Sequence, residues 1–214
     1  MTAGGEQRRT VVLDLGGVLV DWDPRYLYSR LLPPDEVEAF LDEVGFAAWN
    51  HAQDAGGSWE DAVRTLGDRF PHRRALLAAY PERFAETLGG EVPGSVAVLR
   101  ELHQAGHRLL ALTNWSSGTF PHALARFGWL DLFEDVVVSG HEGVAKPDPA
   151  IFRLLLERHR LPAAGTVFVD DSPANVAAAT ALGLTGLLFR GAPRLRADLA
   201  GLGLLPAGHR PGRP

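Results

Sequence analysis

The segment that most restricts the possible fold is residues 11–24, which read VVLDLGGVLVDWDP. Its first apolar run ends at the carboxylate of Asp14, and Gly16 and Gly17 follow almost at once. A short apolar run bounded by glycine predicts a buried strand. Because ligands of open α/β sheets bind beyond the carboxyl ends of the strands, Asp14 is expected at such a rim. Glycines after it would allow a sharp turn and a close backbone approach to a ligand. An Asp that merely caps a turn is the simpler alternative.

The second half of the chain alternates between strand and helix patterns. Strands are expected at residues 10–15, 108–113, 135–139, 166–169 and 185–189. Helices are expected at residues 93–105, 121–127, 149–159 and 172–182, with a short one near 195–200. This alternation is typical of a parallel sheet with helices on both faces. The predicted fold class is therefore α/β.

Residues 24–91 have a different character, because proline and glycine separate a series of helix-like segments. These helices are expected at residues 24–32, 35–44, 47–53, 58–70 and 73–87. Ser58 with Glu60 and Asp61 in the first turn is a favourable helix start. No strand is expected in this span. The sequence thus predicts an α/β core at residues 1–22 and 92–214, and an inserted all-helical cap at residues 23–91.

The composition excludes several classes of protein. The 214 residues carry a net charge of -5 and one lysine, Lys146, so neither nucleic acid nor an anionic membrane is expected as a partner. Cysteine is absent, which rules out disulfides and thiol catalysis. Neither a membrane span nor a secretory leader is recognisable, and a cytoplasmic location is expected. The oligomeric state is left open.

Polar side chains follow the strands of the predicted core. They are Asp14, Thr113 with Asn114, Lys146, and Asp170 with Asp171. Each has an ordinary explanation alone, but parallel strands bring them to one rim. Three clustered carboxylates repel one another unless a hard cation such as Mg²⁺ lies among them. A carboxylate nucleophile, a hydroxyl, a lysine and Mg²⁺ together suit the transfer of a phosphoryl group.

These four segments resemble the four motifs of the haloacid dehalogenase superfamily, in the subfamily with a helical cap after the first strand. The resemblance covers residues 11–189 and implies a Rossmann-like core and a Mg²⁺-dependent phosphatase. It implies that Asp14 is the nucleophile and that Thr113 and Lys146 hold the phosphoryl oxygens. The implied metal ligands are Asp14, the Gly16 carbonyl, Asp171 directly and Asp170 through water.

One position departs from the usual phosphatase motif. A second Asp, which protonates the leaving oxygen, normally stands where this chain has Gly16. The DLGGV start resembles a branch similar to sugar-phosphate phosphatases. Two explanations stay open at this stage. Either the leaving group departs with little help, as from an anomeric sugar phosphate or acyl phosphate, or another residue supplies the proton. The candidate donors are Asp21, Asp23, His51 and Asp54.

The cap is expected to close over the rim and contact the leaving group of a small phosphorylated metabolite. The residues predicted to bind this substrate are Asn114, Trp49, His51 and Asp54. Two other functions are conceivable. A 2-haloacid dehalogenase would use Asp14 against carbon without a metal, but the acidic pair Asp170–Asp171 would hinder its anionic substrate. A regulatory module without catalysis would explain Gly16 but not the intact remainder of the set.

Overall fold

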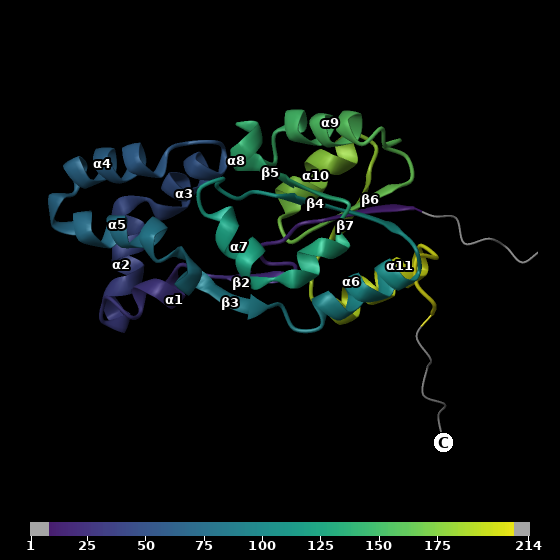
Figure 1. The fold of residues 1–214 in the computed structure, drawn as a ribbon, viewed down its shortest axis with the longest axis horizontal. Helices are drawn as coiled ribbons and strands as arrows, with labels where there is room; N and C mark the ends of the chain where they lie inside the picture. Colours follow the sequence, from purple (N-terminus) through teal and green to yellow (C-terminus); the bar gives the residue numbers. More distant parts are fainter. Residues whose placement is uncertain (1–8, 208–214) are drawn as a thin grey trace, which may run out of the picture.

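The computed structural model describes residues 9–207 and contains a five-stranded parallel sheet (Figure 1). The strand order is β5-β4-β1-β6-β7. The strands are β1 (Thr10–Leu13), β4 (Arg108–Thr113), β5 (Asp135–Val138), β6 (Thr166–Asp170) and β7 (Thr185–Leu188). Every neighbouring pair is parallel, and β1 lies at the centre between β4 and β6. The predicted α/β class is confirmed.

Helices cover both faces of the sheet because successive side chains of a strand point to opposite sides. On β1, Val11 and Leu13 pack in one apolar cluster and Val12 in the other. The first face carries α6 (Ser95–Gln104), α7 (Phe120–Arg126) and α11 (Ala192–Gly201). The second carries α9 (Pro149–Arg158) and α10 (Pro173–Ala181). Both faces of this central strand are therefore buried, which explains its uninterrupted apolar sequence.

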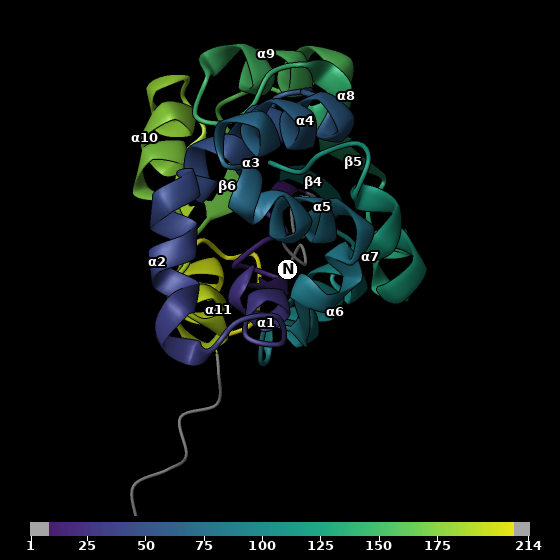
Figure 2. The same cartoon turned by 90° about the vertical axis from the view of Figure 1, so that its left-hand side faces the viewer.

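The inserted helices group together at one end of the sheet (Figures 1 and 2). They are α1 (Arg25–Tyr28), α2 (Pro34–Val44), α3 (Phe46–Asp54), α4 (Trp59–Arg69) and α5 (Arg74–Glu82), with the 3₁₀ turns η1 (Pro71–Arg73) and η2 (Phe84–Thr87). We call this group the cap. The Ser58 side chain accepts a hydrogen bond from the Asp61 amide and begins α4 as predicted. Tyr28 and Tyr80 are fully buried among the aromatic rings of its core.

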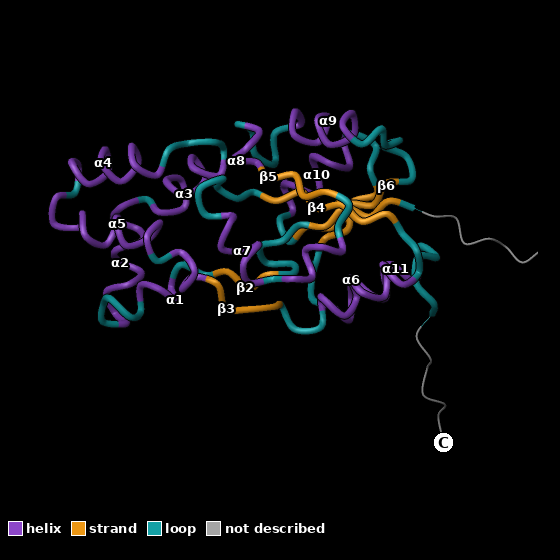
Figure 3. The backbone as a smooth tube through the Cα atoms, in the orientation of Figure 1, coloured by secondary structure: helices purple, strands orange, loops and turns teal. Residues whose placement is uncertain are grey.

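One feature of the insertion was not predicted. Residues Leu88–Glu91 form strand β3, which pairs antiparallel with β2 (Val20–Trp22) at the junction between cap and core (Figure 3). The expectation of no strand in residues 24–91 is therefore wrong. In the sequence, the Gly89–Gly90 pair indicates a boundary between elements. In the structure, Gly89 lies inside the strand, and a Cβ there would lie 2.3 Å from the Asp21 carboxylate. The glycine lets two segments far apart in sequence approach each other.

The helix predicted at residues 73–87 is divided into α5 and the 3₁₀ turn η2, and the boundaries of most other predicted elements differ by a few residues. The helix α8 (Ser139–Glu142) and the turn η3 (Gly128–Leu132) were not expected. The terminal parts of the predicted core, residues 1–8 and 208–214, lie outside the described residues. Within residues 9–207, no helix combines the length and apolar character needed to cross a bilayer.

Candidate active site

Asp14 directly follows β1, at the carboxyl rim of the sheet. Its amide donates to the Val169 carbonyl at 2.9 Å, which continues the pairing of β1 with β6 by one residue. Its Oδ1 accepts a hydrogen bond of 2.7 Å from the Leu15 amide, and the residue is only 7% exposed. The backbone therefore holds one carboxylate oxygen while the other is available to neighbouring groups.

Lys146 supplies the positive charge of the rim. Its Nζ lies 2.9 Å from Asp14 Oδ2 and 2.7 Å from Asp170 Oδ2, and it donates to the Leu112 carbonyl at 2.8 Å. Burial lowers the pKa of Lys146, but attraction to the two carboxylates outweighs this effect and the net shift is upward. A buried ammonium is tolerated when it is paired in this way. Lys146 is thus a fixed cation beneath the Asp14 carboxylate.

Asn114 determines where Lys146 lies. The Asn114 amide donates to the Lys146 carbonyl at 2.8 Å, and its oxygen accepts from the Lys146 amide at 2.8 Å. This pair of hydrogen bonds ties the loop after β5 to the end of β4. Asn114 also lines the pocket described below, and its predicted contact with a substrate stays a prediction.

The acidic pair after β6 divides into a buried and an exposed carboxylate. Asp170 is fully buried and accepts hydrogen bonds from the Ser172 amide at 2.8 Å and from Asn175 at 3.0 Å. Asp171 is exposed. One carboxylate oxygen from each of Asp14, Asp170 and Asp171 lies within 4.8 Å of the others. Burial raises the pKa of Asp14, partial desolvation raises that of Asp171, and acidic neighbours add to both increases.

The donor set at this rim fits Mg²⁺, which binds carboxylate and carbonyl oxygens. Gly17 has a φ of +73°, and a Cβ there would lie 2.2 Å from Asp171 Oδ2. The missing side chain therefore lets the Asp171 carboxylate approach the turn after β1. In that turn the Val20 amide donates to the Leu15 carbonyl, and the Gly17 amide donates to the Val20 carbonyl. Neither hydrogen bond uses the Gly16 carbonyl.

Thr113 places a hydroxyl beside these charges. It is 1% exposed, and within the described part of the chain its buried Oγ1 has no hydrogen-bond partner. A buried hydroxyl without a partner is costly, so such a group is explained when a ligand completes it. A phosphoryl oxygen above Asp14 would accept this hydrogen bond.

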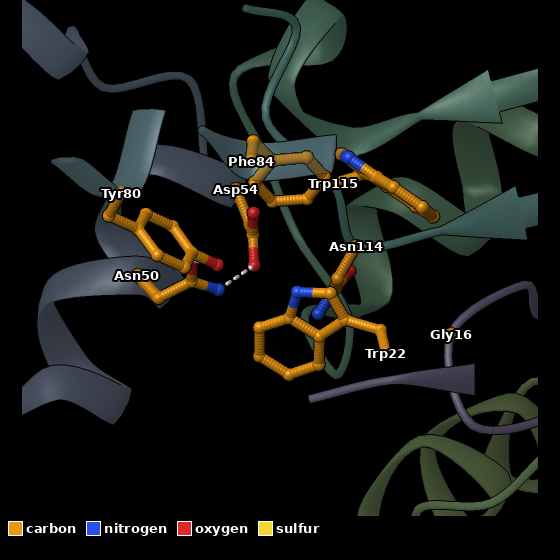
Figure 4. A pocket seen from close by; sticks show the side chains of 8 residues that line it. All are labelled: Gly16, Trp22, Asn50, Asp54, Tyr80, Phe84, Asn114 and Trp115. Carbon is orange, nitrogen blue, oxygen red and sulfur yellow. Dashed lines mark hydrogen bonds between the residues drawn. The ribbon is translucent and has the colours of Figure 1, made fainter. Parts of the chain in front are cut away.

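A pocket lies between the rim and the cap (Figure 4). Its empty volume is about 330 Å³, including space open to solvent. Gly16, Asn114 and Trp115 line it from the core, and the remaining lining residues are Trp22, Asn50, Asp54, Tyr80 and Phe84. Four of the eight are aromatic, so the pocket combines flat apolar walls with a few polar groups. This composition is common in small-molecule sites.

Asp54 is the acidic member of this pocket. Its Oδ2 accepts a hydrogen bond of 2.8 Å from the Asn50 amide, and the Asn50 oxygen accepts one of 3.0 Å from the Tyr80 hydroxyl. Burial raises the pKa of Asp54 to about 7, although a hydrogen bond from the Ser116 backbone lowers it. Asp54 therefore changes its protonation state near neutral pH.

The other cap residues predicted to face the substrate lie elsewhere. Trp49 is 9% exposed, its ring centroid lies 5.0 Å from that of Trp59, and its Nε1 donates to the Ala62 carbonyl. It belongs to the aromatic core of the cap because its helix turns that face inward. His51 is exposed and lines a neighbouring groove together with Asp54. The structure brings Asp54, but neither Trp49 nor His51, to the pocket beside Gly16.

Several residues of the site were missed from sequence. Tyr80 and Phe84 line the pocket from α5 and η2, and Asn175 holds Asp170. No local pattern distinguishes the two aromatic residues from core residues, since both are buried. The position of Asn175 was detectable, because it lies in the first turn of the helix that follows the acidic pair.

Comparisons with known proteins agree with this geometry. Residues 8–183 match the family model described as haloacid dehalogenase-like hydrolase. A phosphoglycolate phosphatase of Cereibacter sphaeroides is 37% identical over 189 residues, covering 84% of each chain. A sesquiterpene phosphatase of Aspergillus oryzae is 29% identical over 187 residues, covering 84% of this chain and 88% of its own.

Solved structures show the same fold. A haloacid dehalogenase family enzyme of Bacteroides thetaiotaomicron superimposes with a TM-score of 0.68 at 18% identity, over 86% of this chain and 94% of its own. Its complex with magnesium and inorganic phosphate gives a TM-score of 0.66 at 20% identity, over 86% and 95%. The chain belongs to the haloacid dehalogenase-like hydrolases, and it is an enzyme of the hydrolase class.

Proposed function

We propose that the protein is a Mg²⁺-dependent phosphatase that acts on a small phosphomonoester through an aspartyl-phosphate. The observation that carries this proposal is the joint presence at one rim of Asp14, Lys146 and the unpartnered Thr113 hydroxyl. A nucleophile, a cation and a buried hydrogen-bond donor are the groups that phosphoryl transfer requires. The names of the relatives, which include phosphatases for two different substrates, support the same reaction class.

The reaction would proceed in two steps at Asp14. A carboxylate oxygen forms a bond to phosphorus, and the bond from phosphorus to the leaving oxygen breaks. Water then attacks the phosphorus of the aspartyl-phosphate, and the Asp14 carboxylate is released with inorganic phosphate. Lys146 orients Asp14 and neutralises negative charge, and Thr113 donates to a phosphoryl oxygen.

A bound Mg²⁺ would neutralise the charge of the phosphoryl group. Asp14, the Gly16 carbonyl and Asp171 would hold it directly, and Asp170 would act through water. One carboxylate oxygen from each of the three aspartates lies within 4.8 Å of the others, which supports a metal among them. Asp170 suits the indirect role because its oxygens already accept hydrogen bonds from Lys146, Ser172 and Asn175.

For the substrate, we propose a class of compound and not a single molecule. The position of the cap between β2 and β3 supports the subfamily with a helical cap after the first strand. The DLGGV motif favours sugar phosphates, whereas four aromatic pocket walls favour a leaving group with an apolar face. A small phosphorylated metabolite of the cytoplasm satisfies both, and neither nucleic acid nor a membrane is proposed as a partner.

The test is a phosphate-release assay of the purified protein with Mg²⁺. The panel would hold p-nitrophenyl phosphate, acetyl phosphate, phosphoglycolate, sugar phosphates and a prenyl phosphate, with Asp14→Asn as the control. We expect release that EDTA abolishes and Asp14→Asn lacks. Halide release from 2-chloropropionate that persists in EDTA would instead identify a dehalogenase. Absence of hydrolysis across the panel would refute the proposal.

A further inference from the structure

Gly16 leaves the proposed phosphatase without a group to protonate the leaving oxygen. No other side chain fills the space where that group would stand, because a Cβ at Gly16 would meet no atom within 4 Å. The reaction of an unactivated phosphomonoester still needs a proton at the leaving oxygen and a base for the incoming water. A group that supplies both must therefore reach this space from another part of the chain.

Among the four candidate donors, the structure places only Asp54 in the pocket beside Gly16. Asp21 accepts a hydrogen bond from Tyr26, and Asp23 accepts from Arg25, both at the base of the cap. His51 is exposed and lines the neighbouring groove, not the pocket beside Gly16. Figure 4 shows the Asp54 carboxyl on the cap side of the pocket, with Asn114 and Gly16 on the core side.

We propose that Asp54 is the general acid and base of this enzyme and acts from the cap across the pocket. The proposal rests on the proposed phosphatase activity and adds a catalytic residue to it. Transfer of the proton would be direct or through one water, as is usual for a general acid.

The hydrogen bonds around Asp54 suit this role. Because Tyr80 donates to the Asn50 oxygen, the Asn50 amide nitrogen must point to Asp54 Oδ2, where it donates. Asp54 Oδ2 is thereby fixed as an acceptor, and the carboxyl also accepts a hydrogen bond from the Ser116 backbone. A proton on this carboxyl would take a lone pair that neither donor uses. The raised pKa of Asp54, about 7 through burial, agrees with a group that donates a proton and then accepts one.

The charged surroundings of Asp54 do not include a paired cation. Tyr80 contacts the Asn50 that holds it, and the groove on its other side is lined by Arg25, Glu38, Asp42 and His51 among others. Arg25 is engaged by Glu38 and Asp23. A fixed cation would keep Asp54 ionised. Within residues 9–207 Asp54 forms no ion pair, which favours a carboxyl that can carry a proton.

The two steps balance with Asp54 included. In the first, an Asp14 oxygen bonds to phosphorus, the leaving oxygen departs with the bonding electron pair, and Asp54 gives it a proton. In the second, water bonds to phosphorus and gives a proton to the Asp54 carboxylate, while the bond from phosphorus to Asp14 breaks. Both carboxyl groups return to their starting states, and one water has been consumed.

The experiment compares Asp54→Asn with wild type on two substrates that differ in leaving group. With an alkyl phosphate such as glycerol phosphate, we expect the rate to fall by about 10² to 10⁴-fold, the usual size of acid–base catalysis. With p-nitrophenyl phosphate, whose leaving group needs no proton, we expect a rapid burst of about one nitrophenolate per site and then slow turnover. Acid quenching during the slow phase should trap phosphoenzyme.

Two further variants make the result specific. Asp68→Asn removes an exposed cap carboxylate that pairs with Arg74, and it should behave like wild type on both substrates. Gly16→Asp in the Asp54→Asn background should restore part of the alkyl phosphate rate, because the space at Gly16 can accept a side chain. A structural role for Asp54 would give neither the burst nor this rescue.

These measurements distinguish failure of the proposed phosphatase activity from failure of the proposed role of Asp54. Wild-type protein that hydrolyses neither substrate refutes the proposed phosphatase and, with it, the role of Asp54. If wild type is active and Asp54→Asn matches it, only the role of Asp54 is refuted. Equal losses on both substrates, with no burst, would also refute it.

Discussion

The core holds Asp14 two residues before Gly16, and the cap holds Asp54 in the pocket that Gly16 lines, but the surroundings of the two carboxyl groups differ in charge. Asp14 in the core lies 2.9 Å from the ammonium of Lys146 and near two further carboxylates. Asp54 in the cap has an amide as its side-chain partner. Burial raises the pKa of both groups, but only that of Asp14 is opposed by a neighbouring cation.

This difference separates two kinds of chemistry. Lys146 favours the ionised form of Asp14, although burial outweighs it and the pKa of Asp14 is raised to about 7. A bound metal ion would add the further positive charge that keeps this carboxylate ionised for attack on phosphorus. A carboxyl without a cation holds its proton near neutral pH and can donate it. The two environments thus push two identical side chains toward the roles of nucleophile and acid.

The largest expected effect is at Asp14. Asp14→Asn should lower phosphatase activity by about 10⁴-fold or more, the size of loss seen when an enzyme loses its nucleophile. Steady-state phosphate release measures this, and acid quenching should trap no phosphoenzyme. Retention of wild-type activity would contradict the assignment of Asp14 and, with it, the contrast between the two carboxyls.

The next effect concerns the cation of the core. Lys146→Met should lower the free energy of unfolding by about 3–5 kcal/mol, because it leaves two buried carboxylates without their partner. Urea denaturation followed by circular dichroism measures this change. Arg64→Met, which removes an exposed cation from α4, is the control and should change stability by less than about 1 kcal/mol. A Lys146 variant as stable as this control would show that the core carboxylates do not depend on Lys146.

Mg²⁺ should stabilise the core through the same carboxylates. At 100 times its dissociation constant, the ion should raise the free energy of unfolding by about 2.7 kcal/mol, and EDTA should remove this gain. Thermal melts with and without Mg²⁺ measure it. In Asp171→Asn the gain should shrink strongly, whereas Asp54→Asn should keep it. Equal gains in wild type and Asp171→Asn would place the ion elsewhere.

The smallest expected effect is the pH-dependent change in folding stability caused by the Asp54 carboxyl. A rise from 3.8 to about 7 means that ionised Asp54 destabilises the folded state, with an upper limit of about 4 kcal/mol. Above pH 7 this cost is fully present, and it disappears as the pH falls toward 3.8, where the group is protonated in both states. Because Asp54 is only partly buried, we expect Asp54→Asn to be more stable than wild type by about 1–3 kcal/mol at pH 8.5.

Chemical denaturation at pH 8.5 and at pH 5 measures this difference, which should be smaller at the lower pH. Tyr80 contacts the same Asn50 as Asp54 and stays neutral in this range, since burial raises its pKa well above the usual value. A variant that is less stable than wild type at pH 8.5 would show that Asp54 is held as a stabilising anion.

Much of the core could be predicted because its signals are local. A buried strand reads as a short apolar run, and the residue after it must lie at the rim, so the positions of Asp14, Thr113 and Asp170 follow from the chain order. The pairing of β2 with β3 could not be predicted, since it joins residues from the two ends of the insertion. Trp49 was expected at the pocket because its neighbours are polar, but packing turned it into the cap core.

The sequence by itself determined the α/β class and which polar and charged residues follow the strands at the rim. The tertiary structure alone decided which of four candidate acids faces Gly16, because that choice depends on how the cap lies against the core. It also decided the surroundings of Asp54, since burial raises the pKa of this carboxyl and the Asn50–Tyr80 hydrogen bond joins residues that are distant along the chain. Local sequence sets what a side chain can do, and its surroundings in the fold set which state it adopts.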